Sequence, residues 1–390
     1  MSLRALHLAR VADSLKTLAG FLEAGIEPVV VNTDPSIRYE FVPALEARIP
    51  VASNLYHEVK IPSPRLARYA SLLPEIPLPW RRALVRRLAE VLDGSGPVDF
   101  VFAHWGATVI PEIRLLLAAG RRAPPVILNM ETFPTAWRRG ARERLEVSAL
   151  RGVARSLRGA IVTNPEMREY LRGILGELPW MEIHPRPFYY PRSFAPEDDR
   201  AGPAAPEERG IVFLGQADFS DSLNDVREEL RALAQAGLAV HCVRMDGLAH
   251  ENIRFFPAFG GEKMTSGETA SLLRRFRACL VTYRLPSGQA VPIRFRTSYP
   301  SRLLIALAAG VPILLPRSKF PAMERLVLEH GIGHAYDSPE DAFRFVESSA
   351  CDAVRAQALR KRSEFLFDAE SFRGFCARVI RPASVPNRAG

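Results

Sequence analysis

The stretch 294–316, RFRTSYPSRLLIALAAGVPILLP, decides how this 390-residue chain folds. A basic segment rich in hydroxyl groups comes first, followed by the apolar run 303–309 and then by a second apolar run, 311–316. Pro300 suits the first turn of a helix, where a missing N–H costs little, and Gly310 suits the left-handed residue that ends a helix. The stretch therefore predicts a loop, a short helix that is buried on every side, and a buried strand.

The basic segment before this helix has the composition of an anion-binding site. A buried helix presents free N–H groups and the positive end of its dipole at its first turn. Arginine and hydroxyl side chains gather at that end, namely Arg294, Arg296, Thr297, Ser298, Ser301 and Arg302. Together these groups predict a site for a phosphate or a diphosphate. The alternative is a hydroxyl that only caps the helix, beside a surface arginine.

The length and composition of the chain indicate a globular protein with two domains, because 390 residues are too many for one ordinary core. Its 47% hydrophobic and 24% charged residues are ordinary for a soluble protein. No apolar run reaches the roughly 18 residues of a membrane span, and the N-terminus lacks the apolar core of a secretory leader. The four cysteines are widely spaced, which favours reduced thiols in a cytoplasmic protein over a disulfide framework or a metal site.

The formal net charge of +9 comes mainly from arginines, which occur in bursts around residues 81–87 and 138–144. Such bursts suit an anionic partner, which could be nucleic acid, the inner face of a membrane, or a nucleotide-sugar. They are also typical of an ordinary solvated helix face. No zinc-finger, RNA-recognition or helix-turn-helix pattern is present, so no nucleic-acid partner is expected. Peripheral contact with an anionic membrane remains a weaker hypothesis.

Apolar strands alternate with amphipathic helices along the chain, which indicates parallel sheets covered on both faces. Strands are expected in the first half at 4–9, 28–32, 98–103, 126–130 and 159–163, and helices at 11–24, 81–92 and 138–157. The second half predicts strands at 210–214, 239–244, 253–256, 278–283, 311–316 and 334–336, and helices at 225–236, 268–277, 339–348, 353–365 and 372–380.

The predicted fold class is α/β, with two doubly wound, Rossmann-like domains that face a central cleft. The N-terminal domain is expected at 1–190 and the C-terminal domain at 210–366. Prolines crowd the segment 191–209, which is typical of an interdomain linker. Residues 367–390 are predicted to form a C-terminal helix and tail that can return to the N-terminal domain. Ligands of such sheets bind at the carboxyl ends of the strands.

The segment 299–313 resembles the nucleotide-sugar site of the GT-B glycosyltransferases, especially the large retaining family usually numbered four. That family carries the pattern Pro-x-Lys-Leu-x-Glu-Tyr-(Leu/Met)-Ala-(Ala/Ser)-Gly-x-Pro-(Val/Ile). The matching positions are Pro300, Arg302, Leu303, Leu307, Ala308, Ala309, Gly310, Pro312 and Ile313. The segments 161–164, 210–215 and 331–333 are also similar to the family's strand and turn segments. The resemblance implies a donor site in the C-terminal domain, an acceptor site in the N-terminal domain, and retaining transfer without a metal or other cofactor.

This chain departs from the family's pattern at two places. The family's glutamate, which usually holds the donor ribose, is replaced by Ile305, and the loop 216–221, where the family places an arginine and a lysine, is acidic. One interpretation is that Arg294, Arg296 and Arg302 take over the diphosphate. The other is that donor binding has been lost.

Further candidate residues follow other predicted strands. Gly215 and Gln216 could approach the donor, and Tyr283 could contact its nucleoside, although a turn glycine and a surface tyrosine are the alternatives. His104 and Glu131 are the candidate catalytic residues, as a base or as hydrogen-bond partners of the acceptor. For them the alternatives are a packed histidine and a turn-capping glutamate. The weaker candidates Asp13 and Asp34 could be turn or cap residues, and Trp105 could stack on a sugar or pack in the core.

The sequence favours a cytoplasmic hexosyltransferase that moves a sugar from a nucleotide-diphosphate sugar to a glycan, lipid or small-molecule acceptor, with peripheral contact at the inner membrane face as a weaker expectation. Two alternatives stay open. One is a nucleotide-sugar epimerase with the same fold, and the other is a non-catalytic relative that binds a partner or a glycan. A nicotinamide dehydrogenase is disfavoured, since no Gly-x-Gly-x-x-Gly follows the first strand.

Overall fold

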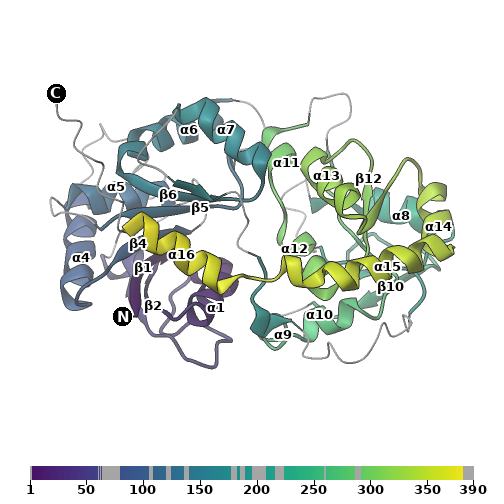
Figure 1. Ribbon diagram of the computed structural model, residues 1–390, viewed down its shortest axis with the longest axis horizontal. Helices are drawn as coiled ribbons and strands as arrows, with labels where there is room; N and C mark the ends of the chain where they lie inside the picture. Colours follow the sequence, from purple (N-terminus) through teal and green to yellow (C-terminus); the bar gives the residue numbers. More distant parts are fainter. Residues whose placement is uncertain are drawn as a thin grey trace. The chain divides into compact units, whose positions relative to one another are not determined.

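The computed structural model describes residues 2–59, 61, 63, 80–104, 109–119, 124–135, 140–176, 182–184 (backbone only), 189–195, 208–215, 224–258, 261–285 and 291–380. The chain divides into two compact units, drawn in Figure 1. Unit 1 comprises Met1–Phe188 together with Asp368–Gly390, and unit 2 comprises Tyr189–Phe367. The prolines at 196, 203 and 206 of the predicted linker lie outside the described residues, whereas Phe194 is buried in a short 3-10 helix, Arg192–Phe194.

Unit 1 contains a parallel sheet in the order β3-β2-β1-β4-β5-β6-β7. Its strands are β1 (Leu3–Ala9), β2 (Ile26–Asn32), β3 (Val51–Asn54), β4 (Phe100–His104), β5 (Val126–Met130), β6 (Leu157–Val162) and β7 (Glu182–His184). Every residue of β4 and β5 is buried, because helices cover both faces of the sheet. This explains why these strands read as continuous apolar runs with little alternation.

The helices of unit 1 pack around this sheet and against one another. They are α1 (Leu15–Glu23), α2 (Leu55–Glu58), α4 (Arg81–Gly94), α5 (Ile110–Ala118), α6 (Ala141–Val153), α7 (Pro165–Leu175) and α16 (Ala369–Ile380). Helices α1 and α5 are buried over most of their length. In α4, Leu84, Leu88 and Val91 are buried while Arg82 and Arg86 are exposed. Two arginines of the α4 burst thus lie on a solvated helix face, whereas Arg87 pairs with Glu58, and the membrane contact suggested for this burst stays a prediction.

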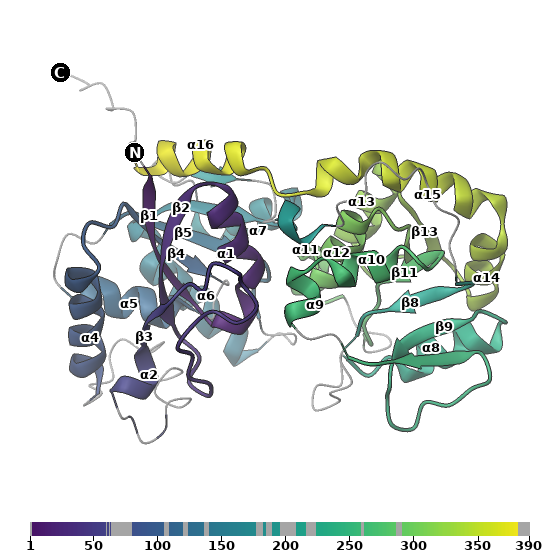
Figure 2. The same ribbon diagram turned by 90° about the horizontal axis from the view of Figure 1, so that it is seen from below.

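The C-terminal helix α16 packs against unit 1, beside α1 and β6, as the sequence had suggested it could (Figure 2). The ring of Phe372 stacks on Phe21 with centroids 5.7 Å apart and meets Phe102 edge-on at 6.1 Å. A Cβ atom at Gly159 in β6 would lie 2.9 Å from the ring of Phe375 and 3.0 Å from Val379. The absence of a side chain at Gly159 therefore lets α16 lie directly on the sheet.

Unit 2 contains a parallel sheet in the order β10-β9-β8-β11-β12-β13. Its strands are β8 (Ile211–Phe213), β9 (Val240–Val243), β10 (Ile253–Phe256), β11 (Ala278–Leu280), β12 (Ile313–Pro316) and β13 (Gly333–Tyr336). Its helices are α8 (Arg227–Gln235), α9 (Gly261–Thr265), α10 (Glu268–Leu273), α11 (Ile293–Thr297), α12 (Ser301–Ala309), α13 (Pro321–His330), α14 (Pro339–Glu347) and α15 (Ser349–Lys361). A 3-10 helix, Arg362–Phe365, follows α15.

Helix α12 is the buried helix that the opening stretch predicts, since every residue from 303 to 309 is buried. Gly310 ends it in the left-handed region, with φ 69°. Pro300 is the residue before the helix and not part of its first turn, which corrects one detail of the prediction. At the other end, Arg274 donates to the carbonyl of Ala309 at 3.0 Å, and Arg362 to that of Ala308 at 2.6 Å. These two guanidinium groups satisfy carbonyls that a helix end leaves free, and they hold α12 in place.

The boundaries of several elements differ from the predicted ones. The helix predicted at 138–157 is α6 followed by a 3-10 turn, Ala154–Ser156, and its last residue, Leu157, begins β6. The strand predicted at 278–283 ends at Leu280, and the helix predicted at 268–277 ends at Leu273. Strand β3, between two prolines at 50 and 62, was not predicted, because four residues give too little pattern to recognise.

Candidate functional site

Both sheets have a topological switch point, where helices leave neighbouring strands in opposite directions and open a crevice at the carboxyl ends. In unit 1 this point lies between β1 and β4, and in unit 2 it lies between β8 and β11. Most of the candidate residues follow these strands or their neighbours. Each unit therefore carries one candidate region at the carboxyl edge of its own sheet.

In unit 2, Arg302 lies at the switch point. Its guanidinium carbon is 4.3 Å from the centroid of the Tyr283 ring and 5.0 Å from that of Phe213. Nη1 donates a hydrogen bond to the carbonyl of Thr282 at 3.2 Å. Phe213 ends β8, and Thr282 and Tyr283 follow β11, so residues after both central strands hold this side chain. Aromatic faces and one carbonyl fix the planar guanidinium while its other N–H groups can face a ligand.

Two buried hydroxyl groups lie in the segments around Arg302. Within the described part of the chain, neither Thr282 Oγ1 nor Ser298 Oγ has a hydrogen-bond partner. No side chain caps the N-terminus of α12, since the residue there is Pro300, and Ser301 is exposed in the first turn. A buried hydroxyl without a partner is costly unless a ligand supplies one. Thr297 is different, because its Oγ1 already donates to the carbonyl of Ile293 at 3.0 Å.

Arg294 and Arg296 do not lie in a loop, which is what the sequence predicts for this segment. The segment forms the short helix α11, in which residues two apart point about 200° from each other. Phe295 turns into the core, while Arg294 lies over its ring at 5.2 Å and Arg296 is exposed. The structure thus brings Arg302 to the switch point and shows no contact that would bring Arg296 there.

Gly215 has a packing role that the sequence did not show. A Cβ atom at this position would come within 1.8 Å of the Phe213 ring, so only glycine fits beside it. Because that ring also supports Arg302, Gly215 acts on the site through Phe213. Its neighbour Gln216 lies outside the described residues.

Tyr283 belongs to an aromatic cluster, and its ring is 5.1 Å from that of Phe295 and 6.0 Å from that of Phe320. With Arg302 also against its ring, Tyr283 supports the guanidinium, and contact with a nucleoside stays a prediction. Ile305 is 8% exposed and lies within the apolar body of α12. It packs where the resembling family has its glutamate.

In unit 1, His104 is buried, and both of its ring nitrogens have hydrogen-bond partners. It is therefore a packed histidine, which was the alternative to a catalytic base. Nδ1 of its ring lies 3.0 Å from Nδ2 of Asn129 and 3.3 Å from Oγ1 of Thr17. Since Nδ2 of Asn129 can only donate, Nδ1 accepts, and the proton resides on Nε2, which donates to the carbonyl of Asp13 at 3.1 Å. Burial lowers the pKa of His104, so the ring is neutral. It positions neighbouring groups and has no nitrogen left to take a proton.

Glu131 forms an ion pair with Lys16, whose Nζ lies 2.8 Å from Oε1. The side chains are 8% exposed at Lys16 and 13% at Glu131, so the pair is largely shielded from water. Burial alone would raise the pKa of Glu131, but electrostatic interactions with Lys16 and His104, with the hydrogen bonds from Lys16 and Asn129, together outweigh burial, so the pKa lies below its ordinary value. Nδ2 of Asn129 also donates to this carboxylate at 3.3 Å. Glu131 is therefore an ionised hydrogen-bond acceptor and a weak base.

The weaker candidates Asp13 and Asp34 both pair with Arg10, at 3.4 Å and 3.1 Å. Asp34 is buried, and its carboxylate also accepts from the N–H of Ser36 at 2.8 Å, which is the turn role given as its alternative. The candidate Trp105 lies outside the described residues.

The centre of unit 1 contains a second buried histidine, His7. This histidine makes the stability of unit 1 depend on pH. His7 is fully buried, and neither ring nitrogen has a hydrogen-bond partner among the described residues. Burial, with a smaller effect of His104, lowers the pKa of His7 well below the ordinary 6.5. The unfolded chain therefore binds a proton that the folded chain excludes. The resulting loss of stability is absent above pH 6.5 and grows as pH falls below it.

We expect His7→Phe to reduce this acid sensitivity. Between pH 6.5 and 5 the free energy of unfolding should fall more gently in the variant, with a difference in slope that approaches about 1.4 kcal/mol per pH unit. Urea unfolding curves at several pH values would measure both slopes. Parallel slopes for the variant and the unmodified protein would contradict the assignment of His7.

Comparison with known proteins gives matches among solved structures. No protein-family model and no curated protein matches the sequence. The chain resembles a sucrose-phosphate synthase of Thermosynechococcus elongatus, with a TM-score of 0.64, 14% identity, and coverage of 97% of this chain and 98% of that one. It also resembles Anabaena HepE in complex with UDP, with a TM-score of 0.60, 12% identity, and coverage of 97% and 99%. A trehalose-phosphate synthase of Burkholderia xenovorans matches with a TM-score of 0.55, 13% identity, and coverage of 97% and 99%.

The chain has the GT-B fold. This confirms the fold class inferred from the segment 299–313 and from the alternation of strands and helices. In this GT-B chain no helix of the described residues is long and apolar enough to cross a membrane. Among the same residues no three His, Cys, Asp or Glu side chains are grouped so that they could hold a metal ion.

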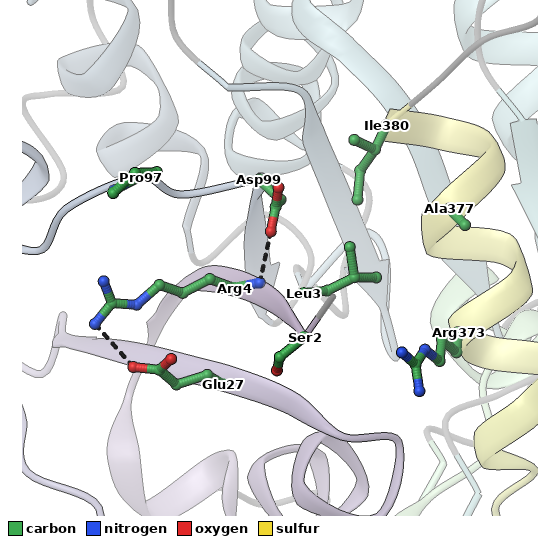
Figure 3. A pocket seen from close by; sticks show the side chains of 9 residues that line it. All are labelled: Ser2, Leu3, Arg4, Glu27, Pro97, Asp99, Arg373, Ala377 and Ile380. Atoms are coloured by element: carbon green, nitrogen blue, oxygen red, sulfur yellow. Dashed lines mark hydrogen bonds and ion pairs between the residues drawn. The ribbon is translucent and has the colours of Figure 1, made fainter.

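One cavity of this GT-B chain lies away from both switch points. It has a volume of about 590 Å³ and is found in unit 1 at the amino ends of β1 and β2 (Figure 3). Arg4 and Glu27 form an ion pair of 2.8 Å in its wall, and Arg373, Ala377 and Ile380 of α16 line its other side (Figure 3). Ligands of parallel sheets bind at the opposite edge, so this cavity is not the candidate site.

Two lysines at the carboxyl edges of the sheets were not predicted from the sequence. Lys16 in α1 pairs with Glu131, and Lys319 after β12 pairs with Glu229 at 3.3 Å. Nothing in the sequence brings either pair together, since the partners lie far apart in the chain. A signal was available for Lys319, because it follows a predicted buried strand of the C-terminal domain.

Proposed function

We propose that this chain is a glycosyltransferase that moves a hexose from a nucleotide-diphosphate sugar to a hydroxyl group of an acceptor. Unit 2 would bind the donor. The observation that carries the proposal is Arg302, which is fixed at the switch point by Tyr283, Phe213 and the Thr282 carbonyl. An arginine held in this way suits a diphosphate, because its side chain is already ordered and binding costs little conformational entropy.

The same arrangement would stabilise the charge that develops during transfer. As the bond between sugar and diphosphate breaks, negative charge grows on the diphosphate oxygens. The guanidinium of Arg302, the free N–H groups at the start of α12, and the hydroxyl groups of Thr282 and Ser298 would donate to it. In this proposal Arg302 and the N-terminus of α12 supply the positive charge that a metal ion supplies in other transferases, and the hydroxyl groups add hydrogen bonds.

The acceptor would bind at the carboxyl edge of unit 1. There Glu131 is an ionised acceptor of hydrogen bonds, and its neighbour Lys16 is a donor, so the pair suits a sugar or other hydroxyl-bearing molecule. Neither His104, with both nitrogens engaged, nor Glu131, with its lowered pKa, is suited to remove a proton. This favours retaining transfer, in which the departing diphosphate assists the incoming hydroxyl on the same face of the sugar.

Similar structures make UDP the first nucleotide to try. HepE was solved in complex with UDP, and the trehalose-phosphate synthase is named as UDP-forming. Those names apply to those proteins, whose identity to this chain is 12% and 13%. The acceptor class, whether glycan, lipid or small molecule, is therefore left open in the proposal.

A thermal-shift panel with UDP, GDP, ADP and TDP tests the proposal. We expect at least one nucleotide to raise Tm, because a ligand that binds only the folded state stabilises it by about 2.7 kcal/mol at a hundredfold excess over Kd. The corresponding nucleoside serves as the control, since the diphosphate is the group that Arg302 would hold. If none of the four raises Tm, a non-catalytic binding protein becomes the better interpretation of this fold.

A further inference from the structure

We propose that Lys319 is a second cationic contact for the donor diphosphate, and that Glu229 holds its ammonium group until the ligand arrives. The inference rests on the proposed function and adds a residue to the same site. Neither the motif 299–313 nor the arginines of the basic segment point to Lys319, and its role follows from where the fold places it.

Lys319 lies at the same sheet edge as Arg302. Strands β11 and β12 are parallel neighbours, and the N–H of Val281 donates to the carbonyl of Leu314 at 2.9 Å. The residues that follow the two strands therefore emerge side by side. Phe320, next to Lys319, is fully buried, and its ring lies 6.0 Å from that of Tyr283, on which Arg302 rests. The segment that carries Lys319 thus packs directly against the support of Arg302.

The first turn of α8, together with Asp225 just before it, binds side chains at or just beyond the ends of three strands. Glu229 of this turn accepts the hydroxyl of Tyr336, at the end of β13, at 2.5 Å. Its other oxygen lies 3.3 Å from Nζ of Lys319, after β12. The neighbouring carboxylates Asp225 and Glu228 pair with Arg284, after β11, at 3.4 Å and 3.8 Å. Glu229 therefore has two partners, and only one of them, the tyrosine, is fixed in the core.

The backbone before Lys319 is strained and firmly held. Ser318 has φ 60°, in the left-handed region that is unfavourable for a residue other than glycine. Its N–H donates to Glu324 at 2.7 Å, and Arg317 donates to the carbonyl of Ala335 at 2.7 Å. These hydrogen bonds stabilise a backbone conformation at Ser318 that serine rarely adopts. Such strain is typical of segments that place a side chain against a ligand.

The ion pair between Lys319 and Glu229 is weak enough for a bound diphosphate to replace Glu229 as the partner of Lys319. The side chains are 42% and 25% exposed, and ion pairs that are this accessible to water contribute little to stability. A diphosphate carries more charge than one carboxylate and offers several oxygens to an ammonium group. When Lys319 turns to the ligand, Glu229 keeps its hydrogen bond from Tyr336, so its carboxylate is not left without a partner.

Calorimetric titration of the full chain with UDP, or with whichever panel nucleotide raises Tm most, tests the inference. We expect Lys319→Met to weaken binding about tenfold, which corresponds to one charge-assisted hydrogen bond. The control is Lys263→Met, which removes an exposed lysine of α9 and should leave affinity unchanged. Equal affinities of Lys319→Met and Lys263→Met would overturn the inference. If the unmodified chain binds no nucleotide, the proposed function itself fails.

A second variant tests the part played by Glu229. Glu229→Gln removes the charge that competes for Lys319 but keeps an oxygen for the Tyr336 hydroxyl. Binding should become a few times tighter, and the gain should disappear in the double variant Glu229→Gln/Lys319→Met. Unchanged or weaker binding in Glu229→Gln would contradict the release of Lys319 by the ligand. Melting curves of all variants would show whether each remains folded.

Discussion

Arg302→Ala is expected to weaken nucleoside diphosphate binding by about ten- to a hundredfold. A hydrogen bond from the guanidinium to a phosphate oxygen contributes about 1.5–3 kcal/mol, and about 1.4 kcal/mol changes affinity tenfold. Two aromatic rings and the Thr282 carbonyl already hold the side chain, so binding costs little of its conformational entropy. Calorimetric titration with the panel nucleotide that binds best would measure the loss.

The matched variant is Arg302→Lys, which keeps the charge but loses the planar group that lies against Tyr283 and Phe213. We expect its affinity to fall between those of Arg302→Ala and the unmodified protein. Arg302→Ala should also lower Tm modestly, because the guanidinium contacts both rings in the absence of ligand. An affinity that is the same in all three proteins would remove Arg302 from the site, and with it the main argument for the proposed function.

Phe372→Ala is expected to destabilise unit 1 by about 3 kcal/mol or more, the usual cost of removing a buried phenylalanine ring. The ring fills the space between α16 and the sheet, against Phe21 and Phe102. Urea unfolding followed by tryptophan fluorescence would report on unit 1, because all four tryptophans precede residue 189.

Two further variants show whether the loss comes from this contact. Ala377→Ser, on the exposed side of α16, should leave stability nearly unchanged. Gly159→Val should be strongly destabilising, since even a Cβ atom would lie 2.9 Å from Phe375. If Phe372→Ala unfolds at the same urea concentration as Ala377→Ser, α16 is not part of the core of unit 1.

Much of the fold was predictable because its signals are local. The apolar run 303–309 and Gly310 define the body and the end of α12, and the central strands β4 and β5 are mostly apolar because both of their faces are buried. Helix α11 was missed, since five residues with two arginines resemble a loop. Its helical turn depends on Phe295, which packs against Tyr283 and Phe320, and those contacts are invisible in the sequence.

The candidate site was predicted less completely, because its residues act through partners distant in the chain. Arg302 was identified from the helix start, but the rings that hold it come from β8 and from the segment after β11. His104 was expected at a strand end, yet its burial follows from contacts with Asn129 and Asp13 on other elements. The predicted role of Glu131 changes once Lys16 is seen beside it. Long-range pairs of this kind carry no sequence pattern.

Hydrogen exchange measured by mass spectrometry, with and without the panel nucleotide that raises Tm most, tests the central claim most directly. If unit 2 binds the donor diphosphate at its switch point, amide protection should increase in peptides covering 211–215, 281–285 and 297–304, which contain Phe213, Tyr283 and Arg302. Exchange in unit 1 should change little with the nucleotide alone. No added protection in these three segments, or protection confined to unit 1, would contradict the account.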